Sequence, residues 1–103
     1  MAELAFLERL EALIRERLRE TPDGSYTAKL AERGIVGAAQ KLGEEGVELA
    51  LAAVAEGDAE VVGESADLVY HLLVVLALRG IAFASVVETL EARHRERTAR
   101  ADS

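Results

Sequence analysis

Cysteine is absent from this sequence of 103 residues. Without thiols the chain has no disulfide, no thiolate zinc site and no cysteine nucleophile. Absence of cysteine is typical of proteins from a reducing compartment, so we expect a cytoplasmic protein. Half of the residues are hydrophobic, which is enough for one modest core without cross-links.

Long apolar runs and a basic surplus are also lacking. The longest apolar run, Leu72 to Leu78, is far shorter than the roughly 20 residues that span a bilayer, and the N-terminus has no leader pattern. Acidic residues outnumber basic ones by 19 to 12, and the formal net charge is -7. Nucleic-acid affinity depends largely on lysine and arginine neutralising phosphates, so we expect neither a membrane span nor a nucleic-acid partner.

What the sequence does contain is helical periodicity. From residue 2 to about 20, apolar residues recur every three or four positions, which predicts an amphipathic helix. Thr21 to Gly24 predicts a turn, followed by a short helical piece that ends near Gly34. Further helices are expected at about 37–56, at about 59–78 with Asp58 as N-cap, and from about 83–85 to 94 with Ser85 as N-cap.

These segments predict an all-α fold, an antiparallel helical bundle of about four to five helices. We expect a single domain over residues 1–95, because the length leaves no room for a second domain. Residues 96–103 are charged and lack apolar periodicity, so this C-terminal tail is expected to fray.

Acidic residues form a pattern in the middle of the chain that helix packing does not require. On the first of two neighbouring helices, Lys41, Glu44, Glu45 and Glu48 fall within roughly 100° of arc. On the second, Glu64 and Asp67 are one turn apart. The connection near Gly57 is so short that the helices must be antiparallel neighbours, which makes their two carboxylate faces oppose each other.

Carboxylates that oppose one another next to an apolar helix repel strongly unless a cation lies between them. Oxygen ligands without cysteine favour a hard cation, Mg²⁺ or its substitute Mn²⁺, which commonly holds substrate phosphates. The structural alternative is a solvated charged face. That alternative favours mixed charges at i and i+4, whereas Glu44 and Glu48 form a repelling pair.

Histidine separates two kinds of helical metal site. A carboxylate-bridged di-iron bundle uses Glu-x-x-His motifs, and neither acidic helix has one. His71 lies one turn beyond Asp67, and a lone histidine beside an apolar run is more often a core or hydrogen-bonded residue than a ligand. The pattern therefore favours a magnesium site over a di-iron site.

The acidic pattern resembles a known family. Glu44-Glu45-x-x-Glu48 followed by Glu64-x-x-Asp67 is similar to the metal motif of the all-α nucleoside triphosphate pyrophosphohydrolases. More narrowly, the chain from about Leu4 to His94 resembles the phosphoribosyl-ATP pyrophosphatase family. This resemblance rests on Ser25-Tyr26-Thr27-x-Lys29-Leu30, on the Gly43 to Glu45 segment and on Ala66-Asp67-Leu68-x-Tyr70-His71.

The resemblance implies Mg²⁺-dependent hydrolysis of phosphoribosyl-ATP to phosphoribosyl-AMP and pyrophosphate, the second step of histidine biosynthesis, by a homodimer. It implies metal ligands at Glu45, Glu48, Glu64 and Asp67, and catalytic roles for Glu44 and Glu45. Apart from the resemblance, we hypothesise which residues bind the substrate. These residues are Ser25, Tyr26, Lys29, Lys41 and His71. Many relatives also carry a cyclohydrolase domain with cysteine-bound zinc, which a chain without cysteine cannot reproduce.

Two other functions remain open from the residues alone. A pyrophosphohydrolase that hydrolyses other nucleotides would use the same acids, because a metal site built from carboxylates recognises only the phosphates of its substrate. A noncatalytic helical adaptor would instead use the acids to bind a basic partner. Independently of the resemblance, a chain of this length cannot cover the apolar helix at about 68–78 on all sides, so we expect a homodimer.

Overall fold

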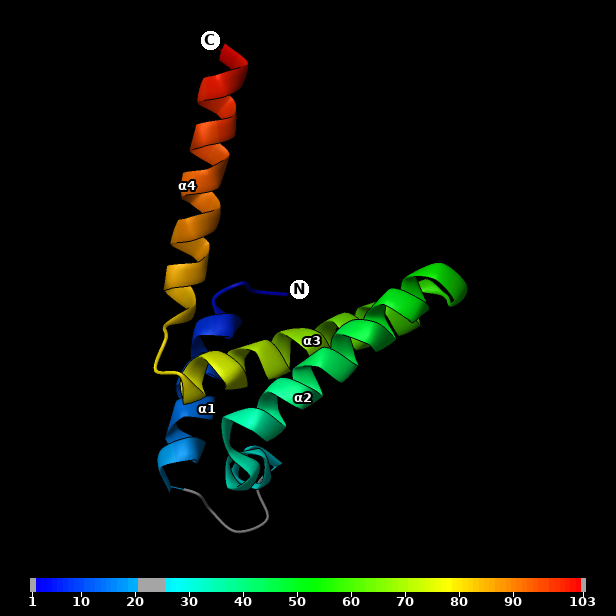
Figure 1. The fold of residues 1–103 in the computed structure, drawn as a ribbon, viewed down its shortest axis with the longest axis vertical. Helices are drawn as coiled ribbons and strands as arrows, with labels where there is room; N and C mark the ends of the chain where they lie inside the picture. Colours follow the sequence, from blue (N-terminus) through cyan, green and yellow to red (C-terminus); the bar gives the residue numbers. More distant parts are fainter. Residues whose placement is uncertain (1, 21–25, 103) are drawn as a thin grey trace.

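The computed structural model describes residues 2–20 and 26–102, without the side chains of 26–32 and 102. Within the described residues there are four α-helices and no strand (Figure 1). The helices are α1 (Phe6–Glu20), α2 (Tyr26–Ala55), α3 (Asp58–Leu78) and α4 (Phe83–Asp102). The all-α fold class is confirmed.

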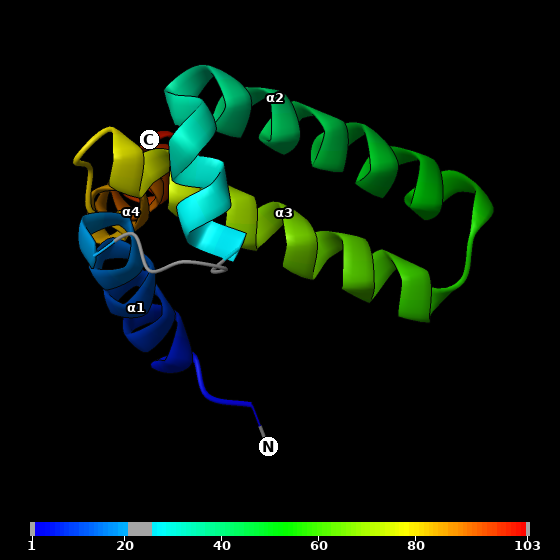
Figure 2. The same cartoon turned by 90° about the horizontal axis from the view of Figure 1, so that it is seen from below.

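Helices α2 and α3 form an antiparallel hairpin and lie side by side along their length (Figures 1 and 2). The N-cap of α3 is Gly57, which has extended backbone (φ -85°, ψ 174°), and no side chain caps the helix. The expectation that Asp58 is the N-cap is therefore wrong by one residue. Asp58 is the first residue of α3, where its negative charge still stabilises the positive end of the helix dipole.

Gly34 divides α2 into two segments that point in different directions (Figure 2). Its backbone (φ 70°, ψ -166°) lies where a residue with a side chain would be strained. The helix boundary predicted near Gly34 is thus present as a sharp kink. The segment after the kink carries the acids.

The core lies where α1 crosses the second half of α3. Ile14 of α1, Ala38 of α2, and Leu73 and Val74 of α3 are each at most 1% exposed. Apolar residues of the same α1 face pack against this cluster, among them Leu7, Leu10 and Leu18. Figure 2 shows that the hairpin continues well beyond α1, so its acidic part lies outside the core.

Helix α3 is more apolar than this chain can cover. By length and composition it is the one described helix able to cross a membrane, and 17% of its most apolar stretch is buried. Buried His71 and half-buried Glu64 lie on this helix and interact electrostatically with residues of α2, which favours a core helix of a globular bundle. The apolar surface of α3 that this chain leaves exposed remains to be buried by another surface.

Helix α4 projects from the body as a separate arm (Figure 1). Its first N–H, on Phe83, donates a 2.7 Å hydrogen bond to Oε2 of Glu11 in α1. The expectation that Ser85 caps this helix is wrong, because Ser85 lies inside the first turn and Glu11 accepts from the helix end instead.

The last helix also runs farther than the expected end at residue 94. It continues to Asp102 through the segment 96–102 that we expected to fray. Arginine and glutamate there are good helix formers, and the Thr98 hydroxyl donates to the His94 carbonyl at 3.0 Å. Favourable local propensity thus extends the helix without an apolar face.

We expect Glu11→Ala to destabilise the start of α4. Losing the carboxylate leaves the Phe83 N–H without its acceptor, which costs about 1–2 kcal/mol for a partly buried bond to a charged group. Hydrogen exchange of the amides in the first turn of α4 measures this loss. Glu8→Ala removes a similar acid one turn earlier in α1 and serves as the control. Equal exchange in both variants would contradict the cap.

Candidate metal centre between α2 and α3

Three carboxylates from the two arms of the hairpin converge. Glu45 and Glu48 on α2 and Glu64 on α3 each offer an oxygen, and these three oxygens lie within 4.8 Å of one another. Residues 45 and 48 share a helix face because they are one turn apart, and the antiparallel hairpin brings residue 64 opposite. Glu64 thus lies opposite Glu45 and Glu48, as expected for this part of the two acidic faces.

The cluster includes buried oxygens without a hydrogen-bond donor. Glu45 is 4% exposed, and its Oε2 atom and Oε2 of Glu64 are buried without a partner among the described residues. A buried carboxylate oxygen without a donor is costly, and the cost rises when other negative charges are close. Hard divalent cations bind such oxygens, so the residues present fit Mg²⁺ or Mn²⁺.

Lys41 lies on one side of the cluster. Its Nζ atom is 3.0 Å from Oε1 of Glu45, one helical turn away. This hydrogen bond is the main reason that the pKa of Glu45 lies below its ordinary value, although burial acts in the opposite direction. Glu45 is therefore held as a carboxylate, the form that can bind a cation.

Glu64 has the opposite electrostatic environment. Burial raises the pKa of its carboxyl above the ordinary value, and a hydrogen bond with the Glu48 carboxyl and the nearby charges of Glu48, Glu45 and Asp67 raise the pKa further. The pKa values of two neighbouring carboxyl groups in one cluster are thus shifted in opposite directions. Among the residues that the structure describes, Glu45 has a compensating lysine and Glu64 has none, and a cation would supply the positive charge that Glu64 lacks.

Asp67 and Glu44 lie beside the cluster rather than in it. Asp67 is exposed, but its charge influences both Glu64 and His71. The side chain of Glu44 is exposed and accepts a 3.1 Å hydrogen bond from Nε2 of Gln40. The geometry brings together three of the four predicted metal ligands, and the roles of Asp67 and Glu44 stay predictions.

His71 is 4% exposed and stacks edge-on against Tyr70, with ring centroids 5.5 Å apart. Burial is the main reason that the pKa of His71 lies below its ordinary value, although Glu45 and Asp67 oppose the shift. A neutral, buried imidazole favours the structural alternative over direct contact with a nucleotide. Ser25 lies outside the described residues, as do the side chains of Tyr26 and Lys29.

A hollow of about 230 Å³ opens directly beside the cluster, toward the tip of the hairpin. Glu48 and Glu64 line it together with Leu51, Ala55 and Glu56. Sequence reasoning missed the last two and treated Leu51 only as a flank of the acids. The spacing from Glu48 to Leu51 and Ala55 was the available signal, since it continues the same helix face.

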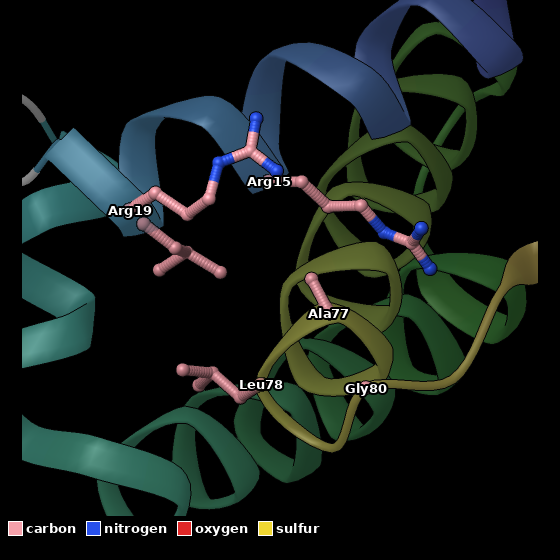
Figure 3. Close-up of a pocket in the computed structure, with 6 residues that line it drawn as sticks. Arg15, Arg19, Ala77, Leu78 and Gly80 are labelled. Atoms are coloured by element: carbon pink, nitrogen blue, oxygen red, sulfur yellow. The ribbon is translucent and has the colours of Figure 1, made fainter.

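A second hollow, of about 370 Å³, lies at the other end of α3 (Figure 3). Leu18, Ala77 and Leu78 line it, with Arg15 and Arg19 at its edge. The guanidinium groups of the two arginines point in different directions and do not meet at one point (Figure 3). This hollow therefore lacks the convergent charges of an anion site.

Comparison with known proteins identifies a family that this chain matches over most of its length. Residues 7–94 match the family model described as phosphoribosyl-ATP pyrophosphohydrolase. The chain belongs to this family. The narrower resemblance, which rests on the segments at Ser25, Gly43 and Ala66, is confirmed.

Relatives in the phosphoribosyl-ATP pyrophosphohydrolase family occur in two lengths. The histidine biosynthesis bifunctional protein HisIE of Xanthomonas campestris is 60% identical over 90 residues, which are 87% of this chain and 44% of that protein. The phosphoribosyl-ATP pyrophosphatase of Pyrobaculum calidifontis is 54% identical over 87 residues, 84% of this chain and 93% of the relative. That of Ignicoccus hospitalis is 47% identical over 93 residues, 90% and 91% of the two chains. This chain thus spans less than half of the bifunctional relative.

We expect the metal-free protein to lose stability as pH rises, through Glu64. Its pKa is raised on folding, so its contribution is fully present below the ordinary carboxyl pKa of about 4 and is lost as pH rises through the raised value. Glu64→Gln removes this loss. Urea unfolding in a chelator should therefore show the variant gaining stability over the parent between about pH 4 and pH 7.

The matched control is Glu16→Gln, the same chemical change at an exposed position in the interior of α1. We expect the control to follow the parent at every pH. A Glu64→Gln profile parallel to that of the parent would contradict the electrostatic account of the cluster.

Proposed function

We propose that this chain hydrolyses phosphoribosyl-ATP to phosphoribosyl-AMP and pyrophosphate with Mg²⁺, Mn²⁺ being a possible substitute, as the second step of histidine biosynthesis. The observation that carries the proposal is the group of carboxylate oxygens of Glu45, Glu48 and Glu64, two of whose residues hold a buried oxygen without a donor. Membership in the phosphoribosyl-ATP pyrophosphohydrolase family supports the substrate.

The proposed ligands of the cation are Glu45, Glu48 and Glu64, with Asp67 completing the set from the next turn of α3. When bound, a divalent cation neutralises phosphate charge and favours attack of water on phosphorus. The chain itself contributes position, because two helices fixed against each other hold the carboxylates before substrate arrives.

The remaining residues are assigned by their place around the acids. Glu44 is exposed beside Glu45 and is proposed to orient the attacking water. Lys41 contacts Glu45 and lies within reach of phosphate oxygens that approach the cluster from that side. Glu48, Leu51 and Ala55 line the hollow on the opposite side, where an apolar wall suits the nucleoside rather than the pyrophosphate.

The proposed assembly is a cytoplasmic homodimer without a nucleic-acid or membrane partner. Val47, Leu51 and Val54 recur along one side of α2 and are each at least 60% exposed. Exposed apolar residues at this spacing on a hairpin are typical of a helix interface. The uncovered part of α3 supports the same assembly.

We expect Glu48→Gln and Asp67→Asn to lower Mg²⁺-dependent turnover roughly 100-fold or more, because each replaces a charged cation ligand by a weaker neutral one. Release of pyrophosphate from phosphoribosyl-ATP measures the effect, and Glu60→Gln is the control with the same change outside the centre. Full Mg²⁺-dependent turnover in either variant would overturn that residue's assignment.

The substrate is tested separately with the parent chain. Phosphoribosyl-ATP should give pyrophosphate at least about 100-fold faster than ordinary nucleoside triphosphates at equal concentration, because residues 7–94 match the phosphoribosyl-ATP pyrophosphohydrolase family. Equal rates would favour a pyrophosphohydrolase of broader substrate range. Absence of Mg²⁺-dependent turnover with every nucleotide would favour the noncatalytic adaptor.

A further inference from the structure

Helix α4 has almost no support from its own chain. Phe83 packs against the core and Val86 is half-buried, but every residue from 93 to 101 is exposed. At about 1.5 Å per residue, its 20 residues make an arm about 30 Å long (Figure 1). A helix of this length without tertiary contacts is only marginally stable in water. The arm therefore needs a surface to pack on.

A groove between α1 and the base of α4 offers such a surface. It encloses about 640 Å³, and Leu7 of α1 and Val87 of α4 contribute to its apolar wall. Four acids line the same groove: Glu8, Glu11, Glu88 and Glu91. The hydrogen bond from Phe83 N–H to Glu11 joins the base of α4 to α1 at one end of this groove.

The groove and the arm have opposite charges. The first half of α4 carries Glu88 and Glu91 with no base, whereas its second half carries four arginines against two acids. Glu8, Glu88 and Glu91 form no ion pair within the described part of the chain, and neither do Arg93, Arg95 and Arg97. An acidic groove and a basic arm on one chain are complementary, but the straight helix prevents the arm from folding back onto its own groove.

We propose that two copies of this chain exchange their α4 arms, each basic arm lying in the α1–α4 groove of the other copy. With one two-fold axis, each groove is filled by the arm of the other copy and no groove or arm is left over, as in an isologous dimer. This inference extends the proposed homodimer by adding a contact surface on α4 to the exposed apolar side of α2, and it does not depend on the catalytic activity.

Helix geometry identifies the central pair. Arg95 lies seven residues after Glu88 and four after Glu91, so all three share one face of α4. When two α4 helices pack antiparallel through this face, Glu91 of each copy meets Arg95 of the other. Each dimer thus contains this ion pair twice, next to the apolar contact of Val87.

The test reverses the charges one at a time and then together. Glu91→Arg and Arg95→Glu should each weaken the dimer roughly tenfold or more in sedimentation experiments at low salt, because attraction becomes repulsion at two symmetric positions. The double variant E91R/R95E, or an equal mixture of the two single variants, should restore the parent dissociation constant. Arg93→Glu makes the same change on the opposite face and should leave the dimer unchanged.

A second measurement locates the contact directly. Because the chain has no cysteine, Glu91→Cys mixed with Arg95→Cys should give a cross-linked dimer on oxidation, whereas Thr89→Cys, on the other side of α4, should not. A monomeric parent at micromolar concentration would overturn both the homodimer and the exchange. A dimer insensitive to both charge reversals, with no 91–95 cross-link, would overturn the exchange alone.

Discussion

Mutual repulsion among Glu45, Glu48 and Glu64 is the constraint on which the candidate site depends. The hairpin places three negative oxygens within 4.8 Å, and two carboxylate oxygens of this group are buried without a donor. Glu45 is buried and Glu64 is half-buried between the paired helices, so these two side chains have little room to move apart. The fold thereby stores an unfavourable arrangement that a divalent cation relieves.

The two ends of the hairpin have different tasks. Near the core, Leu73 and Val74 of α3 are sealed by α1 and by Ala38, and this region supplies stability. Toward the tip, Glu48 is exposed, and the hollow that it lines with Ala55 and Glu64 is open. Separating a packed end from an open end lets a chain of this size carry a charged site without disrupting its core.

Sequence reasoning predicted what depends on local spacing. Helical periodicity predicted the four main helices, and Gly34 predicted the helix boundary that is present as a kink. The register of the hairpin predicted that Glu64 lies opposite Glu45 and Glu48. It failed where contacts are distant in sequence. The acceptor for the start of α4 is Glu11, 72 residues earlier, which no local pattern indicates.

Direct binding of Mn²⁺ to the protein tests the central claim most simply, because it needs no substrate. The amplitude of the electron paramagnetic resonance signal of free Mn²⁺ should fall as the parent protein is added. Glu64→Gln removes one carboxylate of the group and should weaken Mn²⁺ binding strongly. An unchanged free Mn²⁺ signal with the parent, or equal binding by the Glu64→Gln variant, would contradict the account.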